Sequence, residues 1–96
     1  PRVSPTMAAA TANIVIQNRL GLHARPAMSL VDAASAFSSD IHIHKGDQRV
    51  DAKSIMQLMM LAAVQGTPLT ITANGADAEQ AIATLCALVD RKFDEE

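Results

Sequence analysis

A histidine and an arginine lie two positions apart in residues 21–27 (GLHARPA), and a proline follows the arginine directly. An imidazole nitrogen is a competent nucleophile near neutral pH. The planar guanidinium of an arginine binds phosphate oxygens well. His23 and Arg25 are therefore candidates for a site where the histidine is phosphorylated and then gives the phosphoryl group away. The alternative is that His23 only caps a helix.

The spacing of apolar residues predicts that a helix begins at this motif. Apolar side chains recur three, four, seven and ten positions after Ala27, ending at Phe37, which indicates one helix over residues 24–36. Pro26 fits the first turn, where a missing N–H group costs little. The free N–H groups and the positive dipole end of such a helix form an anion site beside His23.

A second pair of histidines, His42 and His44, alternates with isoleucines in residues 41–45 (IHIHK). This alternation predicts a strand, so both imidazoles leave the same face of it. Two ligands are too few for a metal site, and no cysteine or pair of carboxylates nearby completes a set. We therefore expect these histidines on the water-facing side of a sheet, and we predict no metal and no other cofactor.

Ser54 precedes an apolar run that predicts a helix over residues 55–64. With Gln57 three positions later, Ser54 forms the pattern of a capping box. A phosphoserine is also tolerated electrostatically at the start of a helix. Ser54 is thus either a plain N-cap or a site of phosphorylation.

The same helix carries more apolar side chains than one helical stripe can bury. Ile55 is next to Met56, and Met59 and Met60 follow in the next turn. One interpretation is a core stripe with a stray exposed residue. The other is an exposed, adaptable methionine surface for partner proteins.

Composition argues against several classes of partner. The 96-residue chain has 8 basic and 10 acidic residues, a net charge of −2, and only two aromatic residues, Phe37 and Phe93, so nothing favours nucleic acid. No apolar run approaches the length of a membrane span, and the first ten residues lack the pattern of a secretory signal.

The sequence contains no glycine-rich nucleotide-binding loop, so any phosphoryl donor is expected to be another protein. The single Cys86 is interpreted as a small core or boundary residue. A lone cysteine suits a reducing compartment, so we expect a cytoplasmic protein. We also expect the protein to be a monomer.

The remaining segments complete an α+β pattern. Strands are predicted at residues 13–18, 49–52 and 68–74, with a hairpin turn at 46–48, and Asp77 with Gln80 opens a helix that runs to about residue 92. The order β-α-β-β-α-β-α predicts an open-faced β-sandwich. Its four-stranded antiparallel sheet carries three helices on one face and meets water on the other.

The chain is expected to contain one domain, at residues 12–93. Residues 1–11 are rich in Pro, Ala, Ser and Thr and are predicted to be a disordered extension. Residues 1–6 are either a native tail or an addition ahead of Met7. Residues 94–96 (DEE) are expected to fray.

With these residues in view, the chain resembles the HPr family of histidine phosphocarriers over residues 12–93. Two motifs carry the resemblance: GLHARPA, and KSIMQLMMLAAVQGT at residues 53–67. The resemblance implies that His23 accepts a phosphoryl group on Nδ1 from phosphorylated Enzyme I of the phosphoenolpyruvate-dependent phosphotransferase system. The group would then pass to an Enzyme IIA-type acceptor, which makes the protein a phosphoryl-transfer intermediate and not a stand-alone enzyme.

The same resemblance implies roles for further residues. Arg25 would stabilise the transferring phosphate, and the loop around the phosphate would be shaped by Gly21, Ala24 and Pro26. Ser54 would be modified by an HPr kinase/phosphorylase where one exists. The docking surface shared by the partners would contain Ile55, Met56 and Met59.

Two departures keep a second branch of the family open. Leu20 occupies a place where sugar-branch members often carry a small polar residue, and no lysine or arginine occurs from Pro26 to His44. RLGLHARPA is similar to the nitrogen-related regulatory branch. The alternative function is therefore a regulatory phosphocarrier or signalling module, whose phosphorylation state controls partner binding instead of sugar uptake.

Overall fold

The computed structural model describes residues 9–95 and confirms the predicted α+β order. The elements are β1 (Ala9–Val15), α1 (Ala24–Ser35), β2 (Asp40–Lys45), β3 (Gln48–Asp51), α2 (Ile55–Met60), β4 (Pro68–Asn74), α3 (Ala78–Asp90) and a short 3-10 helix, η2 (Lys92–Asp94). The four strands form one antiparallel sheet in the order β1-β4-β2-β3.

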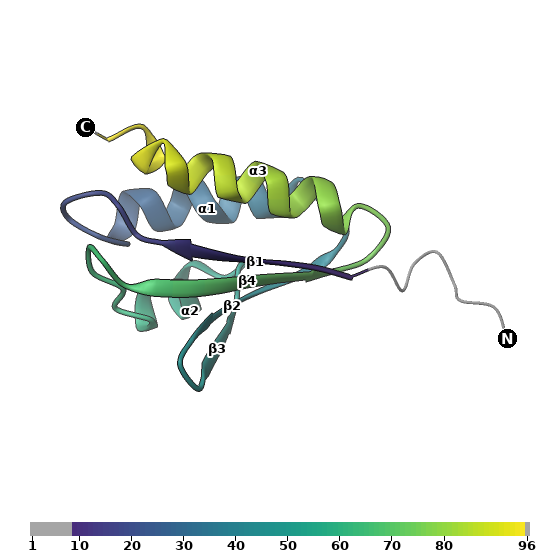
Figure 1. Cartoon of the computed structure of the whole chain (residues 1–96), viewed down its shortest axis with the longest axis horizontal. Coiled ribbons are helices and arrows are strands. Elements are labelled where there is room, and N and C mark those ends of the chain that lie inside the picture. Colours follow the sequence, from purple (N-terminus) through teal and green to yellow (C-terminus); the bar gives the residue numbers. More distant parts are fainter. Residues whose placement is uncertain (1–8, 96) are drawn as a thin grey trace, which may run out of the picture.

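Alternate residues of each strand face a single layer of helices. The apolar residues at these positions, such as Ile41, Ile43 and Ile71, are buried, and α1 and α3 run across this face of the sheet (Figure 1). Lys45 and Gln48 lie on the same face as Ile43, since side chains two positions apart or directly paired share a face. Both donate hydrogen bonds to carbonyl groups at the end of α2. All three helices therefore lie on one side, as predicted.

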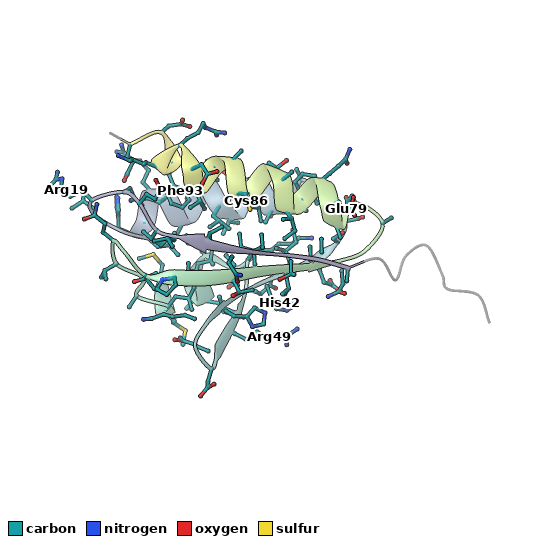
Figure 2. The ribbon with its side chains drawn as sticks, in the orientation of Figure 1. Arg19, His42, Arg49, Glu79, Cys86 and Phe93 are labelled. Carbon is teal, nitrogen blue, oxygen red and sulfur yellow. The ribbon has the colours of Figure 1, made fainter. Side chains whose placement is uncertain are left out.

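The opposite face of the sheet is polar. His44 shares a hydrogen bond of 3.1 Å with the hydroxyl of Thr72, and Arg49 contacts Nδ1 of His42 at 3.3 Å. Figure 2 shows His42 and Arg49 on the side of the sheet away from α1 and α3. In the part of the chain that the structure describes, no three His, Cys, Asp or Glu side chains gather closely enough to hold a metal ion.

β1 begins earlier in the chain than its sequence predicts. The strand starts at Ala9 instead of residue 13, and residues 9–11 pair with residues 72–74 of β4. The prediction of disorder is therefore wrong for residues 9–11, while residues 1–8 lie outside the described part. Alanine is depleted in strands and gives no strand signal by itself, but β4 supplies the backbone hydrogen-bond partners that a sequence window does not contain.

α2 ends at Met60, although its apolar pattern predicts a helix to residue 64. Its N-terminus is as expected, because the hydroxyl of Ser54 accepts a hydrogen bond from the backbone amide of Gln57 at 3.2 Å. The capping box is one-sided, however, since Gln57 Oε1 accepts from the amide of Asp51. The helix stops where Ala62 adopts a positive φ of 51°.

Asp77 does not form the predicted capping pair at the start of α3. Its carboxylate instead accepts hydrogen bonds from the backbone amides of Ser38 and Ser39, at 2.9 and 3.0 Å, and from both serine hydroxyls. These bonds, above all that from the Ser39 hydroxyl and then that from the Ser38 amide, lower the pKa of Asp77 to about 2. Asp77 thus ties the α1–β2 loop to α3.

The C-terminal segment is ordered where fraying was predicted. α3 ends at Asp90, and Lys92, Phe93 and Asp94 all have positive φ angles, of 58°, 55° and 61°. Phe93 is only 5% exposed and joins the core. The prediction of a frayed tail is therefore wrong for Asp94 and Glu95, and Glu96 lies outside the described residues.

Candidate functional site

His23 is the N-cap residue of α1. Its backbone is extended, with φ −83° and ψ −171°, and its carbonyl accepts the amide of Ala27 at 3.0 Å, which begins the helix. The imidazole itself makes no capping hydrogen bond. The side chain is 37% exposed, so the ring is accessible from solvent. His23 is thus the cap of the helix by its position and backbone, while its imidazole takes no part in the capping and is available for other contacts.

The first turn of α1 supplies hydrogen-bond donors beside this ring. The amides of Ala24 and Arg25 precede the first intrahelical hydrogen bond, made by Ala27, and so have no acceptor within the helix. Pro26, which has no N–H group, is buried under the turn, whereas Ala24 and Arg25 are exposed. Two free amides and one guanidinium therefore lie within two residues of the imidazole.

Gly21 shapes the loop that leads into His23. Its φ is +72°, and a Cβ atom there would lie 2.6 Å from the carbonyl oxygen of Ala63. The next residue, Leu22, donates its amide to the same carbonyl at 2.8 Å. The two sequence motifs thus meet, because Ala63 follows α2.

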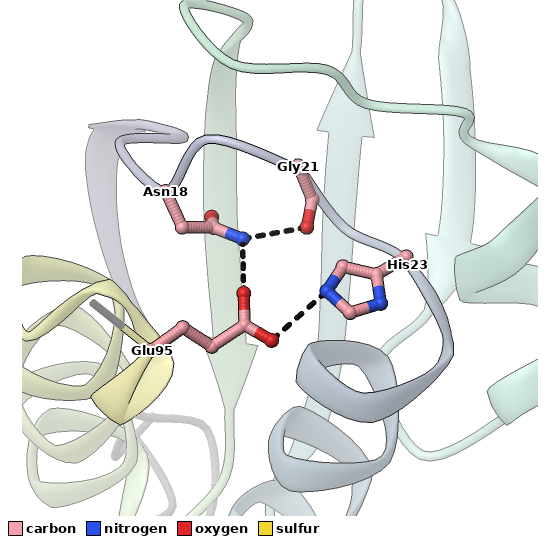
Figure 3. A network of polar contacts seen from close by, with 4 residues as sticks. All are labelled: Asn18, Gly21, His23 and Glu95. Atoms are coloured by element: carbon pink, nitrogen blue, oxygen red, sulfur yellow. Dashed lines mark hydrogen bonds and ion pairs between the residues drawn. The ribbon is translucent and has the colours of Figure 1, made fainter.

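Glu95 reaches His23 from the other end of the chain. Its Oε2 lies 2.9 Å from His23 Nε2, and its Oε1 accepts from Asn18 Nδ2 at 3.0 Å. Asn18 is 1% exposed and also donates to the carbonyl of Gly21 at 2.7 Å. Figure 3 shows this network, with one ring nitrogen of His23 facing Glu95 at the start of the helix. The side chains of two loop residues and one C-terminal residue are therefore joined.

A cleft of about 480 Å³ opens beside this network. It is lined by Arg19, Leu20, Arg25, Ser29, Phe93, Asp94 and Glu95. Two guanidinium groups, from Arg19 and Arg25, border it, and Figure 2 shows Arg19 at the tip of the β1–α1 loop. Two acidic residues, Asp94 and Glu95, line the same cleft, so cationic and anionic groups face each other across it.

Sequence reasoning missed three residues at this site: Asn18, Arg19 and Glu95. Arg19 lies four positions before His23, and a basic residue so close to the motif was a usable signal. Asn18 has no such signal, and Glu95 is 72 residues away from His23. No local pattern links residues at that separation.

Ser54 and the residues after it form a separate surface on α2. Ser54 and Ile55 are half-buried, Leu58 is fully buried, and Met56, Met59 and Met60 are 76%, 42% and 68% exposed. Met56 and Met60 therefore lie mostly in solvent, Met59 is partly covered, and Leu58 forms the buried side of the helix. Of the two interpretations of this helix, the exposures favour the exposed methionine surface over a core stripe with one stray residue.

A family model settles the relationship suggested by the two motifs. The model described as "PTS HPr component phosphorylation site" matches residues 10–91, which include His23, Arg25 and Ser54. The chain belongs to the HPr family. Members of this family are phosphocarriers of the phosphotransferase system.

Individual HPr-family proteins are similar over most of their length. The chain is 44% identical to the phosphocarrier protein NPr of Shewanella violacea, over 85% of this chain and 90% of that protein. It is 45% identical to the phosphocarrier protein HPr of Neisseria meningitidis, over 86% and 93%. The crystal structure of HPr from Thermoanaerobacter tengcongensis superposes with a TM-score of 0.88 at 46% identity, covering 91% and 98% of the two chains.

These relatives confirm the predicted HPr-like fold. Within residues 9–95, no helix has the length and apolar character needed to cross a membrane. Similarity to HPr and NPr proteins is nearly equal, so identity alone does not separate the two branches.

Proposed function

We propose that His23 of this HPr-family protein accepts a phosphoryl group on Nδ1 from phosphorylated Enzyme I and passes it to an Enzyme IIA-type acceptor. The proposal rests on the position of the His23 imidazole at the N-terminus of α1. The ring is partly exposed and lies beside the free amides of the first turn. The expected cytoplasmic location and monomeric state belong to the same proposal and remain predictions.

Each neighbouring residue has a physical role in this proposal. The amides of Ala24 and Arg25 can donate hydrogen bonds to phosphate oxygens, and the guanidinium of Arg25 can do the same while balancing their negative charge. Pro26 removes no donor that the helix needs. Gly21 allows the loop to approach Ala63 closely. Transfer between two histidines then depends mainly on positioning and charge stabilisation.

Phosphoenolpyruvate and a cognate Enzyme I test the acceptor residue. The protein should take up an acid-labile, base-stable label, and His23→Ala should abolish it. His42→Ala is the matched control, because His42 lies on the opposite face of the sheet and should keep full labelling. An unlabelled wild-type protein, or a labelled His23→Ala variant, would refute the proposal.

We further propose that Ser54 is a regulatory phosphorylation site for an HPr kinase/phosphorylase. The serine begins α2, so a phosphate there would meet the positive end of the helix and the fold would tolerate it. Its negative charge would lie next to exposed Met56 and hinder docking of a phosphorylated donor. ATP and the kinase should give an acid-stable label that disappears in Ser54→Ala and persists in Ser35→Ala, which changes an exposed serine of α1. Label that persists in Ser54→Ala would reject the assignment.

The partners are proposed to dock on Ile55, Met56 and Met59. The two methionines are exposed and flexible, which suits brief contacts with more than one partner. Met56→Asp should weaken binding of Enzyme I. Ala83→Asp is the matched control, because Ala83 is exposed on α3 and should not affect binding. Equal affinities for the two variants would remove Met56 from the docking surface.

A regulatory phosphocarrier is the second candidate function, favoured by the similarity to NPr. The two candidates differ in the donor that loads His23. Parallel labelling with the sugar-branch and the nitrogen-branch Enzyme I should show a clear rate preference, and the preferred donor identifies the branch.

A further inference from the structure

The carboxylate of Glu95 engages one ring nitrogen of His23 and leaves the other free. Oε2 lies 2.9 Å from Nε2. An ionised carboxylate only accepts hydrogen bonds, so Nε2 must carry the proton. In the neutral imidazole the lone pair is then on Nδ1. Among the described residues none makes a hydrogen bond to Nδ1, so this nitrogen is available for reaction.

Glu95 is itself held in place by two independent features. Asn18 is buried, and its Nδ2 donates both to Glu95 Oε1 and to the carbonyl of Gly21. Because both partners are pure acceptors, the orientation of the amide is determined. The left-handed backbone at residues 92–94 turns the chain after α3, and the buried ring of Phe93 anchors that turn. The carboxylate is therefore preorganised and 19% exposed.

We propose that Glu95, supported by Asn18, is a positioning residue that makes Nδ1 the reactive nitrogen of His23 and balances the charge of the phosphorylated ring. This inference rests on the proposed function of His23. The Nδ1 lone pair attacks the phosphorus of the donor's phosphohistidine. The donor's N–P bond breaks and its electron pair returns to the donor ring, which becomes neutral.

His23 becomes cationic in this step, because it keeps its proton on Nε2 while Nδ1 forms the new N–P bond. The positive charge faces the carboxylate of Glu95 at hydrogen-bond distance. No proton is transferred in this step. Passing the phosphoryl group on to the next acceptor therefore requires no proton transfer at His23 either. A carboxylate behind a reacting imidazole orients the ring and stabilises its cationic form.

The protonation of the two His23 ring nitrogens tests the contact with Glu95 in the unphosphorylated protein. In protein labelled with 15N-histidine, at a pH where the ring is neutral, His23 should show only the Nε2–H tautomer and a slowly exchanging Nε2 proton. Glu95→Ala should lose this proton to exchange and populate the Nδ1–H tautomer. Glu95→Gln should retain the two signatures only in part, because its single amide oxygen cannot accept from both Asn18 Nδ2 and His23 Nε2. Glu79→Ala is the matched control, since Glu79 is exposed near the start of α3, far from Phe93 (Figure 2).

The rate of phosphoryl transfer tests whether Glu95 stabilises the positive charge of the phosphorylated His23 ring. Phosphorylation by Enzyme I should slow about ten-fold in Glu95→Ala, near the low end for a charged hydrogen bond, because both side chains are partly exposed. Glu95→Gln should fall between this variant and the wild type, and Glu79→Ala should match the wild type. If Glu95→Ala keeps the wild-type tautomer and rate while His23→Ala loses its label, this inference is overturned and the proposed function stands. An unlabelled wild-type protein overturns both.

Discussion

Gly21 packs directly against the backbone of Ala63. A Cβ atom on residue 21 would lie 2.6 Å from the Ala63 carbonyl oxygen and 2.9 Å from the Cα atom of Val64. That same carbonyl accepts the amide of Leu22. The loop that carries His23 is therefore positioned by the segment that follows α2, which connects the two motifs of the family in space.

Gly21→Ala should destabilise the fold by about 2–4 kcal/mol. The substitution adds a left-handed backbone penalty of about 1 kcal/mol to a clash with backbone atoms that cannot rotate away. Gly46→Ala is the matched control, because Gly46 also has a positive φ, of 59°, but has nothing within 4 Å of its added Cβ. Urea unfolding should therefore show a loss near 1 kcal/mol for Gly46→Ala. Equal losses for the two variants would show that the contact with Ala63 is unimportant.

Asp77→Asn should remove part of the acid sensitivity of the fold. The hydrogen bonds from Ser39 and Ser38 lower the pKa of Asp77 from 3.8 to about 2 in the folded protein. A lowered carboxyl pKa contributes stability that is fully present above pH 3.8 and is lost as the pH falls through about 2. The wild-type melting temperature should fall over this interval, and Asp77→Asn should start lower and change less.

The control for this experiment is Asp32→Asn, which changes an exposed carboxylate on α1. Its melting temperature should follow the wild-type curve over the same pH range. If Asp77→Asn also follows that curve, the ties between Asp77 and the α1–β2 loop do not contribute to stability.

Ser54→Ala should cost about 1 kcal/mol of unfolding free energy, because the amide of Gln57 loses its acceptor. Ser54→Asp should stay close to the wild type, since a carboxylate accepts the same hydrogen bond and suits the helix N-terminus. Chemical denaturation of the three proteins measures both effects. A strongly destabilised Ser54→Asp variant would contradict the expectation that the fold tolerates negative charge here.

Leu58 and Met56 lie on opposite sides of α2 and should respond differently to truncation. Leu58 is fully buried, so Leu58→Ala should cost about 3 kcal/mol. Met56 is 76% exposed, and Met56→Ala should change stability by less than about 0.5 kcal/mol. Thermal or urea unfolding separates the two. A large loss for Met56→Ala would mean that its side chain packs in the core after all.

Short-range patterns in the sequence predict much of this fold. The helix that starts at His23, the N-cap at Ser54 and the alternation of residues 68–74 each depend on neighbours within a few positions. The GLHARPA motif likewise contains both His23 and Arg25. Such features are readable because backbone periodicity and capping act over one or two turns.

Only the tertiary structure decided which distant groups meet. The early start of β1 at Ala9 depends on β4, the carboxylate of Asp77 turns to Ser38 and Ser39 instead of capping its own helix, and Glu95 reaches His23 across 72 residues. In each case a polar group takes the partner that the packed sheet and helices bring nearest. The sequence by itself therefore singled out His23 and the start of its helix, because both lie in one short motif. Packing of the C-terminal segment around Phe93 decided that Glu95 contacts Nε2 of that histidine.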